Sequence, residues 1–179
     1  NPLVSPFTVG VSSAAAFGAS VAIVLLGVTS LGGELTIVLC AFGCAVGCAV
    51  LVYLVCAAAG MSPESVVLAG TAMSYLFSAG SSALQCFADE HQLSDVVQWT
   101  FGSLNGISWR EVGIMALFVA PCSLALRRFA LAFNAMAAGE DGEERGLGVT
   151  PAAVPEAAGL LSFLMTAATI SFTRVIGFV

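Results

Sequence analysis

Lysine is absent from this 179-residue chain, because all five of its basic residues are arginine. Charged residues make up only 9% of the sequence, whereas about a quarter of a typical soluble domain is charged. The missing lysine excludes a P-loop nucleotide site, since that loop needs a lysine to reach the phosphates. The net charge of -6 argues against a nucleic-acid partner, which would require a basic surface.

The residues that are present are strongly apolar: 59% of the chain is hydrophobic, and its mean hydropathy is +1.01. So little charge would not cover the core of a soluble protein, and we therefore expect the lipid bilayer as a partner. A helix that crosses the hydrocarbon core needs about 20 mostly apolar residues. The sequence predicts an all-α, polytopic transmembrane bundle with five spans, at approximately residues 8–28, 35–59, 65–87, 109–126 and 157–179.

The two ends of the sequence indicate a piece of a longer protein. The chain begins with Asn1, and no basic segment precedes the first apolar stretch, so this stretch does not have the pattern of a signal peptide. The last residues, TRVIGFV, stop within an apolar stretch. We therefore expect an internal fragment of a larger membrane protein.

The connection at residues 88–108 is polar, but its middle has an apolar pattern. Leu93, Val96, Val97 and Phe101 recur there at helical spacing. This pattern predicts a short amphipathic helix at the membrane surface. Aromatic rings with a polar edge favour the headgroup level, where we expect Trp99 and Trp109.

The connection at residues 127–156 contains an acidic cluster, GEDGEER. Arg127 and Arg128 directly follow the fourth apolar stretch, and arginines beside a span favour the cytoplasmic side. We therefore expect this connection in the cytoplasm and residues 88–108 on the extracytoplasmic side.

One line of polar side chains runs along the third apolar stretch. Its members recur at i, i+4, i+7, i+8 and i+11, which is the spacing of a single helix face. Two interpretations remain open: hydrogen bonds between helices, worth about 0.6 kcal/mol each, or one wall of a water-filled transport pathway. A glutamine facing lipid would leave its amide unsatisfied, so this face contacts protein or water. The candidate pathway residues are Ser74, Ser78, Ser81, Ser82 and Gln85.

Cysteine recurs on one face of the second apolar stretch, at Cys40, Cys44 and Cys48. A metal or redox site is one interpretation, but no histidine or carboxylate in that stretch would complete it. The simpler interpretation is that cysteine acts there as a small apolar packing residue. We expect no metal, no cofactor and no disulfide framework. His91, the only histidine, lies in a polar connection, where we expect it to be solvated.

Two further patterns bear on packing and on catalysis. The GCAVG segment at residues 43–47 is a GxxxG motif, in which small residues let two helices approach closely. The sequence contains no Ser–His–Asp set, no paired buried carboxylates and no HExxH motif. We therefore expect that the chain is not an enzyme.

Five motifs occur in an order that resembles the FecCD-type permeases. The chain begins with NPLVSPFTVGVSSAAAFGA, which is similar to the NPLxxPxxLGVSSGA signature of that family. Further along, LAGTAMSYLFSA resembles the family's fifth span, and WTFGSLNGISW resembles its WxxGSLxGxxW stretch. Near the end, FNAMAAGED resembles LNxLALGE, and VIGFV resembles the start of IGFVGL. These permeases are the membrane subunits of bacterial ABC importers for iron-siderophores, haem and cobalamin.

The resemblance implies a permease of about ten spans, each long enough to cross the bilayer, of which this chain would supply the third to the seventh. It implies three protein partners: a separate ABC ATPase subunit, an extracytoplasmic substrate-binding protein and a second permease copy, as a homodimer or pseudo-dimer. It places the protein in the bacterial cell membrane, with an iron chelate or related metal complex as solute. The alternative is a membrane scaffold or a redox or metal-binding protein that uses the Cys40, Cys44 and Cys48 face.

The resemblance also implies two docking surfaces. In the family, the loop after the sixth span forms short cytoplasmic coupling helices that dock on the ATPase. The corresponding positions in this chain are Asn134, Gly139, Glu140 and Asp141. The binding protein would dock on the opposite side of the membrane, near Trp99, Gly102 and Trp109.

Overall fold

A computed structural model describes residues 10–28, 33–60, 62–102, 109–138 and 153–173, and within these ranges the chain forms α-helices and no strand. The predicted all-α fold is confirmed. The helices are α1 (Val11–Val24), α2 (Glu34–Ala59), α3 (Pro63–Phe87), α4 (Glu90–Phe101), α5 (Trp109–Ala138) and α6 (Ala153–Thr173).

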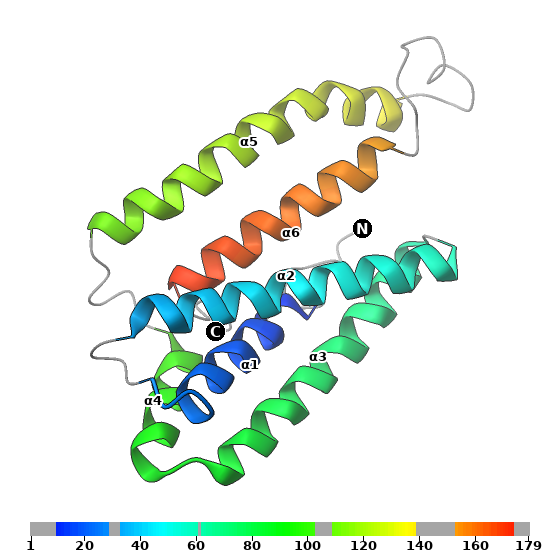
Figure 1. Ribbon diagram of the computed structural model, residues 1–179. Coiled ribbons are helices and arrows are strands. Elements are labelled where there is room, and N and C mark those ends of the chain that lie inside the picture. The colour runs from blue at the N-terminus through cyan, green and yellow to red at the C-terminus, as the bar shows by residue number, and fades with distance from the viewer. Residues whose placement is uncertain (1–9, 29–32, 61, 103–108, 139–152, 174–179) are drawn as a thin grey trace.

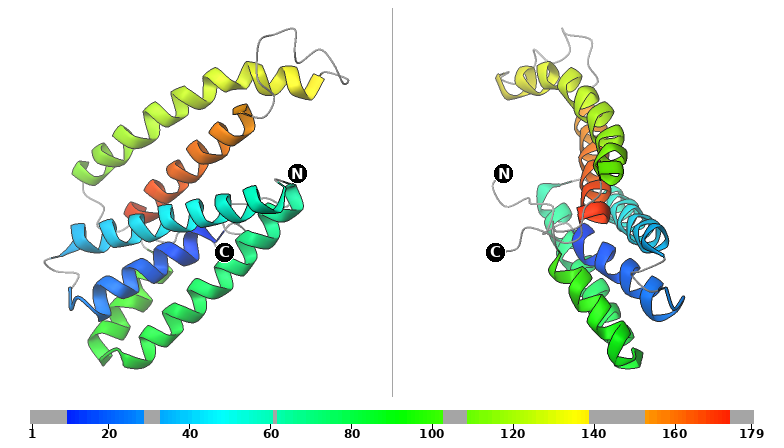
Figure 2. Two further views of the ribbon diagram at one scale, coloured as in Figure 1. Left: turned by 45° about the vertical axis from the view of Figure 1, so that its right-hand side comes forward. Right: turned by 90° about the vertical axis from the view of Figure 1, so that its left-hand side faces the viewer.

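The helices are arranged as an open layer rather than a closed bundle (Figure 1). In this layer α5 packs beside α6, α6 beside α2, and α1 between α2 and α3, while α4 crosses one end of α1. The two turned views in Figure 2 show α5 and α3 at opposite edges. Such a layer leaves many large apolar side chains uncovered, including Leu39, Leu54, Leu68, Tyr75 and Leu117.

Local sequence signals explain several helix ends. The Ser62 hydroxyl accepts a hydrogen bond from the Ser65 N–H at 3.1 Å, which caps the start of α3. A capping box begins α4, in which the Asp89 N–H donates to Oε1 of Gln92 at 3.2 Å. The end of α2 is set by Gly60, whose φ of 94° is in the left-handed region that favours glycine.

The core lies where α1 contacts its neighbours, and it is built mainly from small residues. On α1 the buried side chains include Ala14, Ala15, Ala19 and Ala22. Their small size lets the backbones of α1 and α2 approach each other closely. The closest approach is at Gly18, where an added Cβ would collide with the Cys40 carbonyl oxygen and lie 2.9 Å from Cα of Ala41.

The GxxxG motif does not make this contact. A Cβ at Gly43 or at Gly47 would meet nothing within 4 Å among the described residues. Both glycines are exposed on the outer side of α2. The glycine that brings α1 and α2 together is therefore Gly18, which lies between Ala14 and Ala22 at a spacing of four residues.

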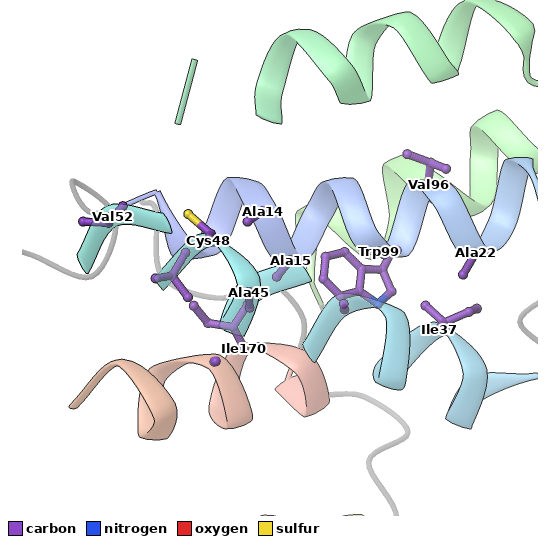
Figure 3. Packing of buried hydrophobic residues seen from close by; sticks show 14 of the residues in the cluster. Ala14, Ala15, Ala22, Ile37, Ala45, Cys48, Val52, Val96, Trp99 and Ile170 are labelled. Atoms are coloured by element: carbon purple, nitrogen blue, oxygen red, sulfur yellow. The ribbon is translucent and has the colours of Figure 1, made fainter. Parts of the chain in front are cut away.

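The first helix is shorter than the stretch 8–28 predicted from the sequence. Its 14 residues correspond to about 21 Å at 1.5 Å per residue, whereas the hydrocarbon core is about 30 Å thick. Its C-terminal half lies at the start of α2, where Figure 3 places Ala22 beside Ile37. Its first turns lie beside the middle of α2, where Ala14 is close to Cys48. The helix α1 therefore begins about halfway along its neighbour.

Two of the five predicted spans are helices long and apolar enough to cross a membrane: Glu34–Ala59 and Glu64–Phe87. Their bounds agree closely with the predicted stretches 35–59 and 65–87. Three shorter apolar helical segments lie within the other predicted spans: Val11–Val24, Val112–Arg127 and Leu161–Ser171.

The last two helices differ from the predicted bounds. The helix α5 was expected to end at Leu126 but continues to Ala138, through the first part of the predicted connection 127–156. Its last ten residues, FALAFNAMAA, contain no glycine or proline and many residues that favour a helix. The helix α6 begins at Ala153 rather than at residue 157, and residues 174–179 of that predicted span lie outside the described residues.

The contact at Gly18 predicts a large difference between two glycine substitutions in the 179-residue chain. A Gly18→Ala substitution pushes a methyl group into the α2 backbone, and we expect it to destabilise the protein by about 1–3 kcal/mol. A Gly43→Ala substitution enters open space and improves helix propensity by up to about 1 kcal/mol. Thermal unfolding of the two variants in detergent measures the difference. Equal melting temperatures would contradict the close packing of α1 on α2.

Candidate functional site

The predicted polar line of α3 lies along the border between its packed face and its open face. Ser81 is buried, Ser74 and Gln85 are half-buried, and Ser78 and Ser82 are exposed. The structure therefore keeps these residues on one side of the helix but gives them different surroundings.

Two members of this line, the half-buried Ser74 and the buried Ser81, form hydrogen bonds within their own helix. The Ser74 hydroxyl donates to the Gly70 carbonyl oxygen at 3.0 Å, and the Ser81 hydroxyl donates to the Phe77 carbonyl oxygen at 3.0 Å. A serine that bonds back to its own helix does not need a partner on another helix. These two bonds do not support the interpretation of the line as a set of interhelical hydrogen bonds.

The start of α1 touches this polar line at Gly10, a contact that the sequence reasoning missed. A Cβ at Gly10 would lie 2.9 Å from the Gly70 carbonyl oxygen and 3.1 Å from the Ser74 hydroxyl oxygen. The φ of Gly10 is 81°, in the left-handed region, so glycine is favoured there by conformation as well as by space. The signal in the sequence was the glycine directly before VSS.

The short helix predicted in the connection 88–108 is confirmed as α4. Trp99 is only 5% exposed because it packs with Val96 into the core around α1, and its expected position at headgroup level stays a prediction. Figure 3 shows the Trp99 ring among the side chains of this core. Phe101 remains exposed, as does Trp109, which is 90% exposed. The buried face of α4 is therefore the one that carries Trp99.

Gly102 ends α4. Its N–H donates to the Trp99 carbonyl oxygen at 3.2 Å, and its φ is 63°. A residue with a side chain rarely adopts this conformation, so glycine fixes the direction in which the chain leaves the helix. Gly102 thus marks the end of α4, and Trp109 begins the next helix.

The predicted ATPase-coupling residues fall at the edge of the described part of the chain. Asn134 lies in the last turns of α5. Gly139, Glu140 and Asp141 lie outside the described residues. Their assignment stays a prediction.

The cysteine face of α2 is a packing surface. Cys48 is fully buried, Cys40 and Cys44 are half-buried, and none of the three forms a disulfide with another described residue. Within the described ranges no group of three or more metal-binding side chains comes together. The backbone of Cys40 forms the surface on which Gly18 rests. The burial of Cys48 and the contact at Cys40 show that this face packs against other helices.

Comparison with known proteins places the chain among transporters. All of it, residues 1–179, matches the FecCD transport family. It is 38% identical to an ABC transporter permease protein of Methanocaldococcus jannaschii over 100% of the chain and 53% of that protein. It is 32% identical to the cobalamin import system permease protein BtuC of Halobacterium salinarum over 100% of the chain and 47% of that protein. The chain thus spans about half the length of these relatives.

A solved structure shares both the fold and part of the sequence. It is described as an inward-facing conformation of a metal-chelate type ABC transporter, and it superposes with a TM-score of 0.83 at 29% identity. The superposition covers 99% of this chain and 55% of the other. The two relatives named above are archaeal, so the likeness extends beyond bacteria. The resemblance seen in the sequence motifs is confirmed, and the chain belongs to the FecCD transport family, a family of non-catalytic membrane permeases.

Proposed function

We propose that this chain forms about half of the permease subunit of an ABC importer for a metal chelate, driven by a separate ATPase. The observation that carries the proposal is the match of the whole chain to the FecCD transport family. The superposition on a metal-chelate type ABC transporter supports it independently. The cobalamin permease among the relatives makes cobalamin a candidate solute beside iron-siderophores and haem.

In this proposal the chain crosses the membrane five times within a permease of about ten spans. The helices α2 and α3 each span the bilayer, and α1, α5 and α6 span it together with the apolar residues that flank them. Residues 88–108, with α4, lie on the extracytoplasmic side. Residues 127–156, including the end of α5, lie on the cytoplasmic side. The open layer is consistent with a partial bundle, because its uncovered apolar side chains need lipid or further helices as neighbours.

Three protein partners follow from the proposal. An ATPase subunit docks on the cytoplasmic positions Asn134, Gly139, Glu140 and Asp141. A substrate-binding protein docks on the extracytoplasmic surface around Gly102 and Trp109. Trp99 is buried below this surface and stabilises it by packing. A second permease copy completes the transporter.

The transport pathway runs along the open border of α3. Ser78 and Ser82 are exposed on a helix of membrane-spanning length, and hydroxyl groups there suit contact with water better than contact with lipid. Ser74, Ser81 and Gln85 continue the same line toward the packed side.

Uptake measured in proteoliposomes tests the function directly. The complete transporter, with its ATPase and binding protein, is expected to accumulate at least one labelled solute from a panel of ferric siderophores, haem and cobalamin. Accumulation should require ATP enclosed in the vesicles, where it reaches the ATPase on the cytoplasmic side of the transporter. Failure to accumulate any member of the panel would contradict the proposed solute class.

Two neighbouring substitutions on α3 test the pathway. Ser78→Leu removes an exposed hydroxyl from the proposed pathway wall, and we expect at least a tenfold loss of uptake, corresponding to about 1.4 kcal/mol. Ala79→Leu adds the same side chain one residue further along, on the exposed face of the same helix, and should leave uptake within about twofold. Both variants should reach the membrane at the wild-type level, which immunoblotting checks. Equal uptake by the two variants would contradict the pathway hypothesis and favour a packing role for the polar line.

The coupling assignment is tested by reversing a charge. If Glu140 pairs with a basic group of the ATPase, Glu140→Arg replaces attraction by repulsion and should weaken assembly by about 2–5 kcal/mol. We expect poor co-purification of the ATPase and a loss of solute-stimulated ATP hydrolysis. Binding-protein docking should be unchanged, because that surface lies on the other side of the membrane.

The control for this variant is Glu156→Arg, at the start of α6. It introduces the same charge change outside the proposed contact and should matter less. Full ATPase assembly and full transport by the Glu140→Arg protein would refute the coupling role of this connection.

A further inference from the structure

The first turn of α1 holds a buried hydroxyl group that has no partner in the part of the chain that the structure describes. Ser12 is only 5% exposed, and its Oγ atom has no hydrogen-bond partner among these residues. The other buried serines of the described residues each donate to the carbonyl oxygen four residues earlier, as Ser20 does to Ala16 at 2.8 Å. A buried polar group without a partner lowers the stability of the folded protein, so its presence needs an explanation other than packing.

Backbone N–H groups that have no acceptor within α1 lie beside this hydroxyl. The first hydrogen bond within α1 runs from the Ala14 N–H to the Gly10 carbonyl oxygen at 3.0 Å. The N–H groups of Val11, Ser12 and Ser13 therefore have no acceptor within the helix. Gly10, the N-cap residue, has no side chain that would accept them. Because helical side chains tilt toward the N-terminus, the Ser12 hydroxyl lies on the same side as these donors.

These donors lie at mid-depth in the bundle. The start of α1 is beside the middle of α2, near Cys48. Gly10 rests against Gly70 and Ser74, which are in the central part of α3. A helix that begins at mid-depth directs the positive end of its dipole into the interior instead of into water. This end adjoins Ser74, the first residue of the polar line on α3.

No side chain in this half of the chain offers the same positive character. The sequence contains no arginine before Arg110 and no lysine at all, so α1 to α4 carry neither. An anionic group that reached the middle of these helices would find no arginine or lysine there. The start of α1 supplies donors and a positive potential at that depth, which is how interrupted helices in other transporters bind anionic groups.

We propose that the start of α1 binds an anionic oxygen group of the transported solute, such as a free carboxylate. The N–H groups of Val11, Ser12 and Ser13 and the hydroxyl of Ser12 donate to it. The inference rests on the proposed transport function and narrows its solute class to chelates that carry free anionic groups. The Ser12 hydroxyl is enclosed in this structure, so binding of the solute requires the packing around it to open.

The test compares Ser12→Ala with Ser20→Ala in the complete transporter, reconstituted in proteoliposomes. The probes are ferric citrate and haem, which carry carboxylates, ferrichrome, which carries no anionic group, and cyanocobalamin, whose phosphodiester is anionic although the molecule has no net charge. We expect wild-type uptake of a carboxylate-bearing probe, and about a tenfold higher KM for it in Ser12→Ala, as for the loss of a hydrogen bond to a charged group. Ser20→Ala removes a hydroxyl that already has a partner and should leave KM unchanged.

Thermal unfolding of the same variants separates binding from folding. Removing a hydroxyl without a partner should leave the melting temperature of Ser12→Ala unchanged or raise it, while its uptake becomes weaker. A lower melting temperature would show that the hydroxyl has a structural partner and would overturn the proposal. An unchanged KM for the carboxylate-bearing probe would do the same.

The probes also distinguish this proposal from the transport function on which it rests. Uptake of ferrichrome alone would support the transport function and overturn the anion site. Uptake of none of the four probes would overturn both.

Discussion

The described bundle depends on how closely α1 approaches α2. In lipid, burial of apolar surface does not drive helices together, because the acyl chains are as apolar as the side chains. Association then rests on close packing, which requires small residues where two backbones meet. Gly18 provides this contact against Cys40 and Ala41, and the alanines on either side of it extend the contact along α1. With α1 held in this position, α3, α4 and α6 also find a surface to pack on.

The same contact organises the polar features. By fixing α1 against the first half of α2, it places the beginning of α1 at mid-depth and brings Gly10 onto Ser74. It also gives α4 a surface on which Trp99 is buried. The polar line of α3, the unpartnered hydroxyl of Ser12 and the buried tryptophan are therefore positioned by the packing of one short helix.

Features determined by a few neighbouring residues were predicted well from the sequence. The bounds of α2 and α3 followed from long apolar stretches that end at Gly60 and at Ala88, and α4 followed from its spacing of apolar residues. Features determined by contacts between helices were not predicted. Nothing in the local sequence distinguishes Gly18, which packs, from Gly43, which does not. Trp99 has an amphipathic ring of the kind that is common at the membrane surface. Its burial depends on the surface that α1 presents.

The shortness of α1 has a consequence for what fixes its position. The helix α2 is by itself long enough to match the hydrocarbon thickness, whereas α1 matches it only together with the apolar residues that flank it. In the proposed topology, the position of α1 therefore depends more on contacts with its longer neighbour than the position of α2 depends on α1.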